Sequence, residues 1–352
     1  MPTVGVSSAP LAADSARDTL TSPRAFRAVW VVLIALLAVE AAHELLGLIG
    51  PEALYETWIH DSIVVASAVL CITRAAREPR ERDVWLAFGV GLACWSAGSV
   101  LWSALYDGTA HPPYPSWADI LWLLWYPFTG LGIALLIRTN VSGFELHRWM
   151  DGLAVTLLVL AATFPITLPP VEQYLNTSQL AGIADVSYPV LDTLLLGAIL
   201  GVFGLMAWRP GKVWMLLGFG CLIMAVADAA FAVQQARGVA TENSYNFVWA
   251  TGALLIAYAA WLPAQRPPRR ELVGWHAIAL PLAAQLFAVG LQTCIVLFPS
   301  FDTQTHRIVV LAVLIIATLQ MILARPRLKT NRQSLERSQR ATDQADDRRF
   351  DT

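Results

Sequence analysis

Long apolar runs, separated by short polar segments, dominate this sequence and constrain its fold more than any other feature. A run of about 17 to 25 apolar residues can cross the roughly 30 Å hydrocarbon core of a bilayer as a helix. Backbone polar groups in lipid must also find their hydrogen bonds inside helices or closed barrels. Only 14% of the 352 residues are charged, against about 25% in soluble domains. The pattern predicts an all-α, polytopic membrane helix bundle.

About ten runs have the length of a transmembrane helix. We expect spans near 26–50, 58–74, 84–107, 116–137, 148–168, 187–208, 213–235, 243–263, 275–298 and 306–325. These spans divide the chain into a disordered cytoplasmic leader at 1–25, a transmembrane domain at 26–325 and a cytoplasmic C-terminal helix or linker at 326–352. The leader is rich in Ser, Ala, Thr and Pro and has no signal-peptide core.

Lysine and arginine are distributed unevenly among the segments that join these runs. Cytoplasmic loops retain Lys and Arg, whereas translocated loops are poor in them. If the N-terminus is cytoplasmic, the translocated segments contain only Arg237 and Arg307 as basic residues, together with acids such as Glu52 and Asp302. The distribution predicts a multi-pass protein of the inner (plasma) membrane with both termini in the cytoplasm.

Cysteine usage and motif content argue against several classes of function. The four cysteines, Cys71, Cys94, Cys221 and Cys294, fall within expected spans and form no CxxC pair, so they fit packing better than a disulfide or a metal site. No phosphate-binding loop, activated nucleophile or basic nucleic-acid patch stands out. We therefore expect no catalytic residue, metal, cofactor or nucleic-acid partner in this chain.

An internal repeat is suggested at an offset of 129 residues. The segment WLAFGVGLACW, from Trp85, aligns with WMLLGFGCLIM, from Trp214, so that a tryptophan and two glycines coincide. A parallel duplication would explain the match, as in some transporter folds. Chance similarity between two glycine-rich membrane helices explains it equally well, because small residues are common where such helices pack closely.

The first span contains an unusual group of polar residues in the segment VEAAHELLG. Glu40, His43 and Glu44 are spaced i, i+3 and i+4, which places them on one helix face. Charged groups in hydrocarbon are costly unless they face the bundle interior, so each is a candidate functional residue. A histidine between two carboxylates would have its charged form favoured, and His43 is therefore a candidate pH-dependent switch.

Further acids occur at a similar depth in other spans. His60 and Asp61 open the second span, and Asp119 and Asp192 follow Tyr-Pro pairs at the outer ends of the fourth and sixth spans. Asp228 lies in the outer half of the seventh span. We expect one outward-facing acidic cavity lined by Glu40, His43, Glu44, His60, Asp61, Asp119, Asp192 and Asp228.

Three interpretations of this cavity are open. The side chains satisfy one another and fix helix register, or they bind a small ligand or cation that the protein senses, or they form a transport path or proton relay. A metal site at His43 is not indicated, because one helix supplies few ligands and no HExxH spacing occurs.

The polar tail from Pro326 offers two interpretations. It shows weak heptad spacing through Leu328, Leu335 and Thr342. A signalling helix that pairs beneath a membrane homodimer is one interpretation, and a solvated tail is the other.

Four segments carry a resemblance to a known family: YPSWADILWLLWYPFTGLG, HRWMDGLAV, SYPVLDTLLLGAIL and LIMAVADAAFAV. Together they resemble the multi-spanning N-terminal sensor region of actinobacterial cyclic-di-GMP signalling proteins. The matching residues are Pro115, Asp119, Tyr126, Pro127, Asp151, Tyr188, Pro189, Asp192 and Asp228. In that family the membrane module precedes PAS, GGDEF and often EAL domains, none of whose output motifs occurs in these residues.

The resemblance implies a sensory module that reports a ligand or membrane state to a cytoplasmic output domain in cis, a diguanylate cyclase or a phosphodiesterase. The chain itself is then not an enzyme, and its partners are the lipid bilayer, a second copy of the chain and a small ligand. Ser99 departs from the expected pattern, because an acid equivalent to Asp228 is missing from the third span. A small-molecule or ion transporter is the alternative function.

Overall fold

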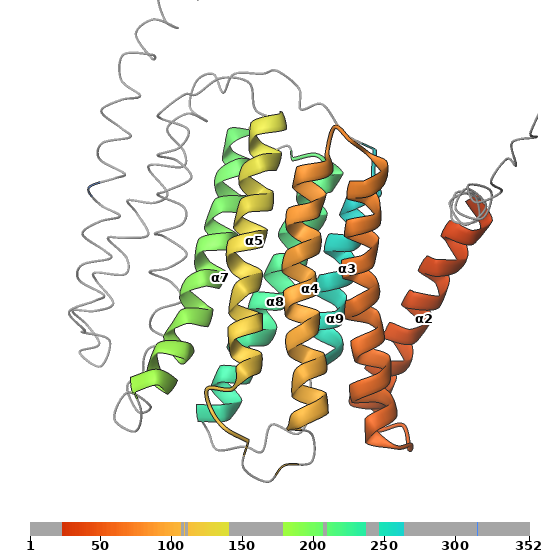
Figure 1. The fold of residues 1–352 in the computed structure, drawn as a ribbon, viewed down its shortest axis with the longest axis vertical. Coiled ribbons are helices and arrows are strands. Elements are labelled where there is room, and N and C mark those ends of the chain that lie inside the picture. The colour runs from red at the N-terminus through yellow and green to blue at the C-terminus, as the bar shows by residue number, and fades with distance from the viewer. Residues whose placement is uncertain are drawn as a thin grey trace, which may run out of the picture.

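The regular structure of this protein is helical. The computed structural model describes residues 23–106, 109, 112–140, 179–206, 210–236, 246–263 and 315, and no strand occurs among them. The elements are α2 (Pro23–Leu46), η1 (Ala53–Ile59), α3 (His60–Arg77), α4 (Arg82–Leu105), α5 (Trp117–Asn140), α7 (Gln179–Leu205), α8 (Lys212–Ala236) and α9 (Asn246–Ala260) (Figure 1).

Five helical stretches are long and apolar enough to cross a membrane: 24–46, 53–77, 82–105, 117–139 and 212–231. Two shorter apolar helices, Ser187–Phe203 and Asn246–Ala260, occupy two more of the expected spans. The prediction of a helical membrane protein is therefore confirmed for the described residues. The expected spans at 148–168, 275–298 and 306–325 and the tail at 326–352 lie outside them, apart from Ile315.

The first helix begins and ends earlier than we expected. It starts at Pro23, within the segment 1–25 that we assigned to a disordered leader, and it ends at Leu46, not at residue 50. Gly47 has φ of 64°, and its N–H donates to the carbonyl of His43 at 3.0 Å. A glycine in the left-handed region is a common helix stop, because it has no Cβ to strain the turn.

Six helices form a closed ring in which each packs against two others, in the order α3, α4, α5, α7, α8, α9 and back to α3. In Figure 1 the helices α7, α5, α4 and α3 stand side by side, with α8 and α9 behind them. Helix α2 packs outside the ring, against α9, η1 and α3. The described cysteines, Cys71, Cys94 and Cys221, are free, and the first and last of them are buried.

The two ends of the bundle differ in charge. Every lysine and arginine of the described residues lies at one end: Arg24, Arg27, Arg74, Arg77, Arg80, Arg82, Arg138 and Lys212. At this basic end the start of α2 meets the end of α9, where the rings of Phe26 and Trp261 lie 4.9 Å apart and the Arg77 guanidinium lies 5.6 Å from the Trp261 ring. The other end, here named the acidic end, carries the buried carboxylates described below.

Paired glycines let α4 and α8 approach both of their neighbours. Gly89 faces α3 and Gly91 faces α5, while Gly218 faces α7 and Gly220 faces α9. The approach is closest at Gly220, where an added Cβ would lie 2.9 Å from the carbonyl oxygen of Gly252. The two pairs hold equivalent places in the units α3–α5 and α7–α9, as a duplication at an offset of 129 residues requires.

Candidate functional site

The acids that we predicted to line one cavity fall into two groups at the acidic end. The first, named the Glu-His cluster, consists of Glu40, Glu44, His60 and Asp61 on α2 and α3. The second, named the Tyr-Asp network, consists of Asp119, Tyr126, Tyr188, Asp192 and Asp228 on α5, α7 and α8. The single acidic cavity that we expected is thus divided.

A buried ion pair forms the centre of the Glu-His cluster. The Nδ1 of His60 donates to Oε1 of Glu40 at 2.7 Å, and the two side chains are 7% and 0% exposed. His60 follows the π-helix η1, and its backbone N–H bonds to the carbonyls of Tyr55 and Thr57. The wider π-helical turn sets where His60 enters α3, and such turns often occur at functional sites.

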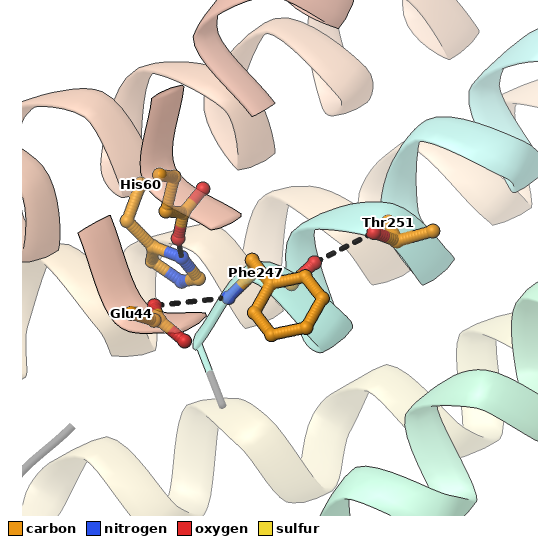
Figure 2. Close-up of polar contacts among 5 residues, drawn as sticks. Glu44, His60, Phe247 and Thr251 are labelled. Atoms are coloured by element: carbon orange, nitrogen blue, oxygen red, sulfur yellow. Dashed lines mark hydrogen bonds and ion pairs between the residues drawn. The ribbon is translucent and has the colours of Figure 1, made fainter. Parts of the chain in front are cut away.

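Glu44 lies against the beginning of α9. Its Oε1 accepts the backbone N–H of Phe247 at 3.2 Å, and Figure 2 shows the carboxylate directed at this nitrogen. The hydroxyl of Thr251 donates to the Phe247 carbonyl at 2.7 Å and tightens the same turn. A carboxylate is favoured at this place, because the first N–H groups of a helix lack partners within it and carry partial positive charge.

Three carboxylate oxygens of the cluster are buried and have no hydrogen-bond donor among the described residues. They are Oε2 of Glu40, Oε2 of Glu44 and Oδ1 of Asp61. Asp61 has a partner for its side chain in Ser103 of α4, but this contact leaves Oδ1 unsatisfied. A buried polar atom without a partner costs roughly 1–3 kcal/mol, and more when it is charged. The cluster is therefore incomplete in hydrogen-bond donors.

His43 does not occupy the position that we expected for it. Its Nδ1 donates to the carbonyl of Leu48 at 2.8 Å, and its ring stacks on Tyr55 with centroids 3.9 Å apart. The hydrogen bond to Leu48, in the turn after α2, thus directs the His43 ring away from Glu40. His60, twenty residues further along the chain, takes the place against the buried carboxylate.

Reciprocal hydrogen bonds between α5 and α7 form the first half of the Tyr-Asp network. Tyr188 of α7 donates to Oδ1 of Asp119 on α5 at 2.9 Å, and Tyr126 of α5 donates to Oδ1 of Asp192 on α7 at 3.0 Å. Oδ2 of Asp119 also accepts the backbone N–H and the hydroxyl of Ser116, at 2.6 and 2.7 Å. This contact resembles a capping box, because the third helical residue reaches back to the residue before the helix.

Asp228 of α8 completes the network. Its Oδ2 lies 3.1 Å from the Tyr126 hydroxyl, and its Oδ1 accepts the indole N–H of Trp249 on α9 at 2.7 Å. Asp192 and Asp228 also hydrogen-bond to each other. In contrast to Glu40, the carboxyl groups of this network have, among the described residues, no buried oxygen without a hydrogen-bond partner.

The first turn of α9 connects the two groups. The backbone N–H of Phe247 binds Glu44 of the Glu-His cluster, and the indole of Trp249 binds Asp228 of the Tyr-Asp network. Sequence reasoning selected the acids but missed Trp249 and Ser116 as their partners. For Ser116 the available signal was its place three residues before Asp119, which is the spacing of a capping box.

Other features of the described residues fit a polar site less well. A groove of about 420 Å³ lies between α3 and α4, but its lining is aliphatic apart from Ser96. Within the described ranges, no group of three or more His, Cys, Asp or Glu side chains is placed to hold a metal ion. Asp151, which belongs to the family resemblance, lies outside the described residues.

Comparison of the chain with protein-family models, with curated proteins and with solved structures finds no match.

Proposed function

We propose that this chain is an integral membrane sensory module, which detects a small ligand at its acidic end and relays the event to a cytoplasmic effector. The observation that carries the proposal is the placement of α9. Its first turn holds Glu44 and Asp228, one carboxylate from each group. Its last turn packs at the basic end, where Trp261 contacts Phe26 and Arg77.

This arrangement supports signal relay by a rigid element. A ligand that engages the Glu-His cluster competes for or reorients Glu44, which holds the beginning of α9. Helix α9 is apolar and largely buried, so a shift at one end is transmitted to its contacts at the other. A ligand shifts an equilibrium between two conformations only if it binds one of them more tightly. Here the two conformations would differ in whether Glu44 keeps its hydrogen bond to α9.

Two further arguments support an effector on the cytoplasmic side. The basic end collects the described lysines and arginines, and the positive-inside rule supports a cytoplasmic position for such an end. The resemblance to sensor regions of cyclic-di-GMP signalling proteins supplies the effector type, a diguanylate cyclase or phosphodiesterase joined in cis. A homodimer with a paired C-terminal helix would carry the movement to it.

Output measured in cells tests this proposal. The chain is joined at its C-terminus to a diguanylate cyclase domain, and the cyclic-di-GMP content is compared between the parent and the Asp228→Asn variant. We expect a change of about threefold or more, since an amide holds the Trp249 indole less well than a carboxylate does (hydrogen bonds to charged groups are worth about 1.5–3 kcal/mol). Glu52→Gln, at an exposed position of the same end, is the control.

Two results would count against the sensor. Unchanged cyclase output in Asp228→Asn, at equal abundance in the membrane fraction, would show that α9 does not relay the signal. Uptake of a solute into vesicles that contain the chain, without any effect of that solute on output, would favour a transporter.

A further inference from the structure

The unsatisfied oxygens of the Glu-His cluster define what its ligand must supply. Glu40 is fully buried, yet among the residues that the structure describes only one of its two oxygens has a partner. Glu44 and Asp61 each add one more buried oxygen without a donor. Electrostatic interactions link Glu40 to both of these acids, so the three carboxylates share one region of the acidic end.

Few basic side chains accompany these acids in the described part of the chain. His60 neutralises at most one carboxylate, and His43 is engaged with Leu48. All the lysines and arginines in the described part of the chain lie at the opposite end. A ligand that supplies the missing hydrogen-bond donors therefore binds more favourably when it also carries positive charge, and an anion is disfavoured.

The separation of the acids distinguishes between kinds of cation. A metal ion needs several ligand atoms that converge at about 2.0–2.6 Å from one point. No group of three such side chains converges in this way among the residues that the structure describes. Glu40 and Glu44 are instead four residues apart on α2, which places their Cβ atoms about 5–6 Å apart. Several N–H donors spread over an organic cation can reach such separated oxygens.

We infer that the Glu-His cluster binds a small organic cation with several N–H donors, of the primary amine or guanidinium class, through Glu40, Glu44 and Asp61. This inference rests on the proposed function in that it names the ligand class of the same sensory site. Each N–H of the cation donates to one of the three oxygens that now lack a donor. The Glu40 and His60 pair stays intact and fixes the orientation of Glu40.

A binding experiment on the whole chain in lipid nanodiscs tests the inference without any effector. Three probes are titrated by calorimetry: 1,4-diaminobutane, choline and Ca²⁺. We expect only the diamine to bind, because choline has positive charge but no N–H donor, and Ca²⁺ needs convergent ligands. Glu44→Gln should weaken diamine binding about tenfold or more, because an amide cannot ionise and replaces one acceptor oxygen by an NH₂ donor.

Control variants distinguish a loss of diamine binding from a loss of folding or of signalling. Glu52→Gln should bind the diamine as the parent does, and Asp61→Asn provides a second site variant should Glu44→Gln insert poorly. Binding of Ca²⁺ or choline as tightly as the diamine, or no binding of any probe, would overturn the inference. If the diamine binds but cyclase output does not respond to it, the ligand class stands and the sensory function fails. If Asp228→Asn changes cyclase output but the diamine does not bind the parent chain, the sensory function stands and the proposed ligand class fails.

Discussion

The two groups of acids at one end of this bundle differ in how their charges are accommodated. In the Tyr-Asp network, hydroxyl, indole and backbone donors surround the carboxylates. In the Glu-His cluster, three buried oxygens lack a donor from the described residues, although a histidine is present. Burial alone therefore does not distinguish a binding site from a structural contact in a membrane protein. The number of buried polar atoms that have no hydrogen-bond partner does distinguish the two groups.

The Tyr-Asp network has the features of a clamp between helices. Tyr126 has one hydroxyl proton, yet carboxyl oxygens of Asp192 and Asp228 lie within 3.1 Å of its oxygen. Since the hydroxyl donates only one hydrogen bond, its second short contact requires a proton carried by a carboxyl group. The network thus joins α5, α7 and α8 through shared protons, and no basic side chain from the described ranges takes part.

The largest effect that distinguishes the two groups is expected at the buried ion pair. Replacing His60 by Leu leaves the Glu40 charge buried and unpaired, which should lower the free energy of unfolding by about 3–5 kcal/mol. His43→Leu removes one hydrogen bond and the stacking on Tyr55 at a half-buried site and should cost only about 0.5–1.5 kcal/mol. Unfolding in mixed detergent micelles measures both. Equal losses in the two variants would mean that the buried pair of His60 and Glu40 contributes no more to stability than the hydrogen bond of His43.

The next effect concerns the close approach of α8 and α9, which holds Trp249 on Asp228. An alanine at Gly220 would place its Cβ 2.7 Å from Ile256 and 2.9 Å from the Gly252 carbonyl oxygen. Forcing the helices apart should cost about 2–3 kcal/mol. At Gly130 the nearest atom to an added Cβ is 3.9 Å away, so Gly130→Ala should change stability by less than about 0.5 kcal/mol. Thermal unfolding midpoints of both variants provide the comparison, and a cost at Gly130 as large as that at Gly220 would contradict it.

The smallest effect compares the two tyrosines of the network. Tyr126→Phe removes a hydroxyl that contacts two carboxyl groups and should cost about 1–2 kcal/mol. Tyr188→Phe removes a contact to Asp119, which keeps two donors from Ser116, and should cost about 0.5–1 kcal/mol. If Tyr188→Phe proves the more damaging of the two, Tyr126 is not the centre of the clamp.

The helices and the candidate acids could be predicted from sequence because each has a local signal. Apolar runs of membrane length marked the helices, although the early end of α2 was missed despite the glycine at position 47, since glycines also occur within helices such as α4. Acids within such runs stood out because lipid-facing charge is costly. Both signals depend only on neighbouring residues.

The grouping of the acids could not be predicted in the same way. Helical spacing favoured His43 as the partner of Glu40, but the π-helical turn before His60 has no recognisable sequence pattern and decides the actual pair. Trp249 is one of several aromatic residues suited equally to a membrane interface. Its role depends on the packing of α9 against α8, which is a long-range property of the fold.

The most direct test asks whether only one of the two groups of acids binds the ligand. Calorimetric titration of 1,4-diaminobutane is repeated on the whole chain with Asp192→Asn, a change confined to the Tyr-Asp network, and compared with Glu44→Gln. We predict that Asp192→Asn keeps the parental affinity within about twofold, while Glu44→Gln loses about tenfold or more. An equal loss of affinity in both variants would contradict the account, because it would show that the acids form one binding site.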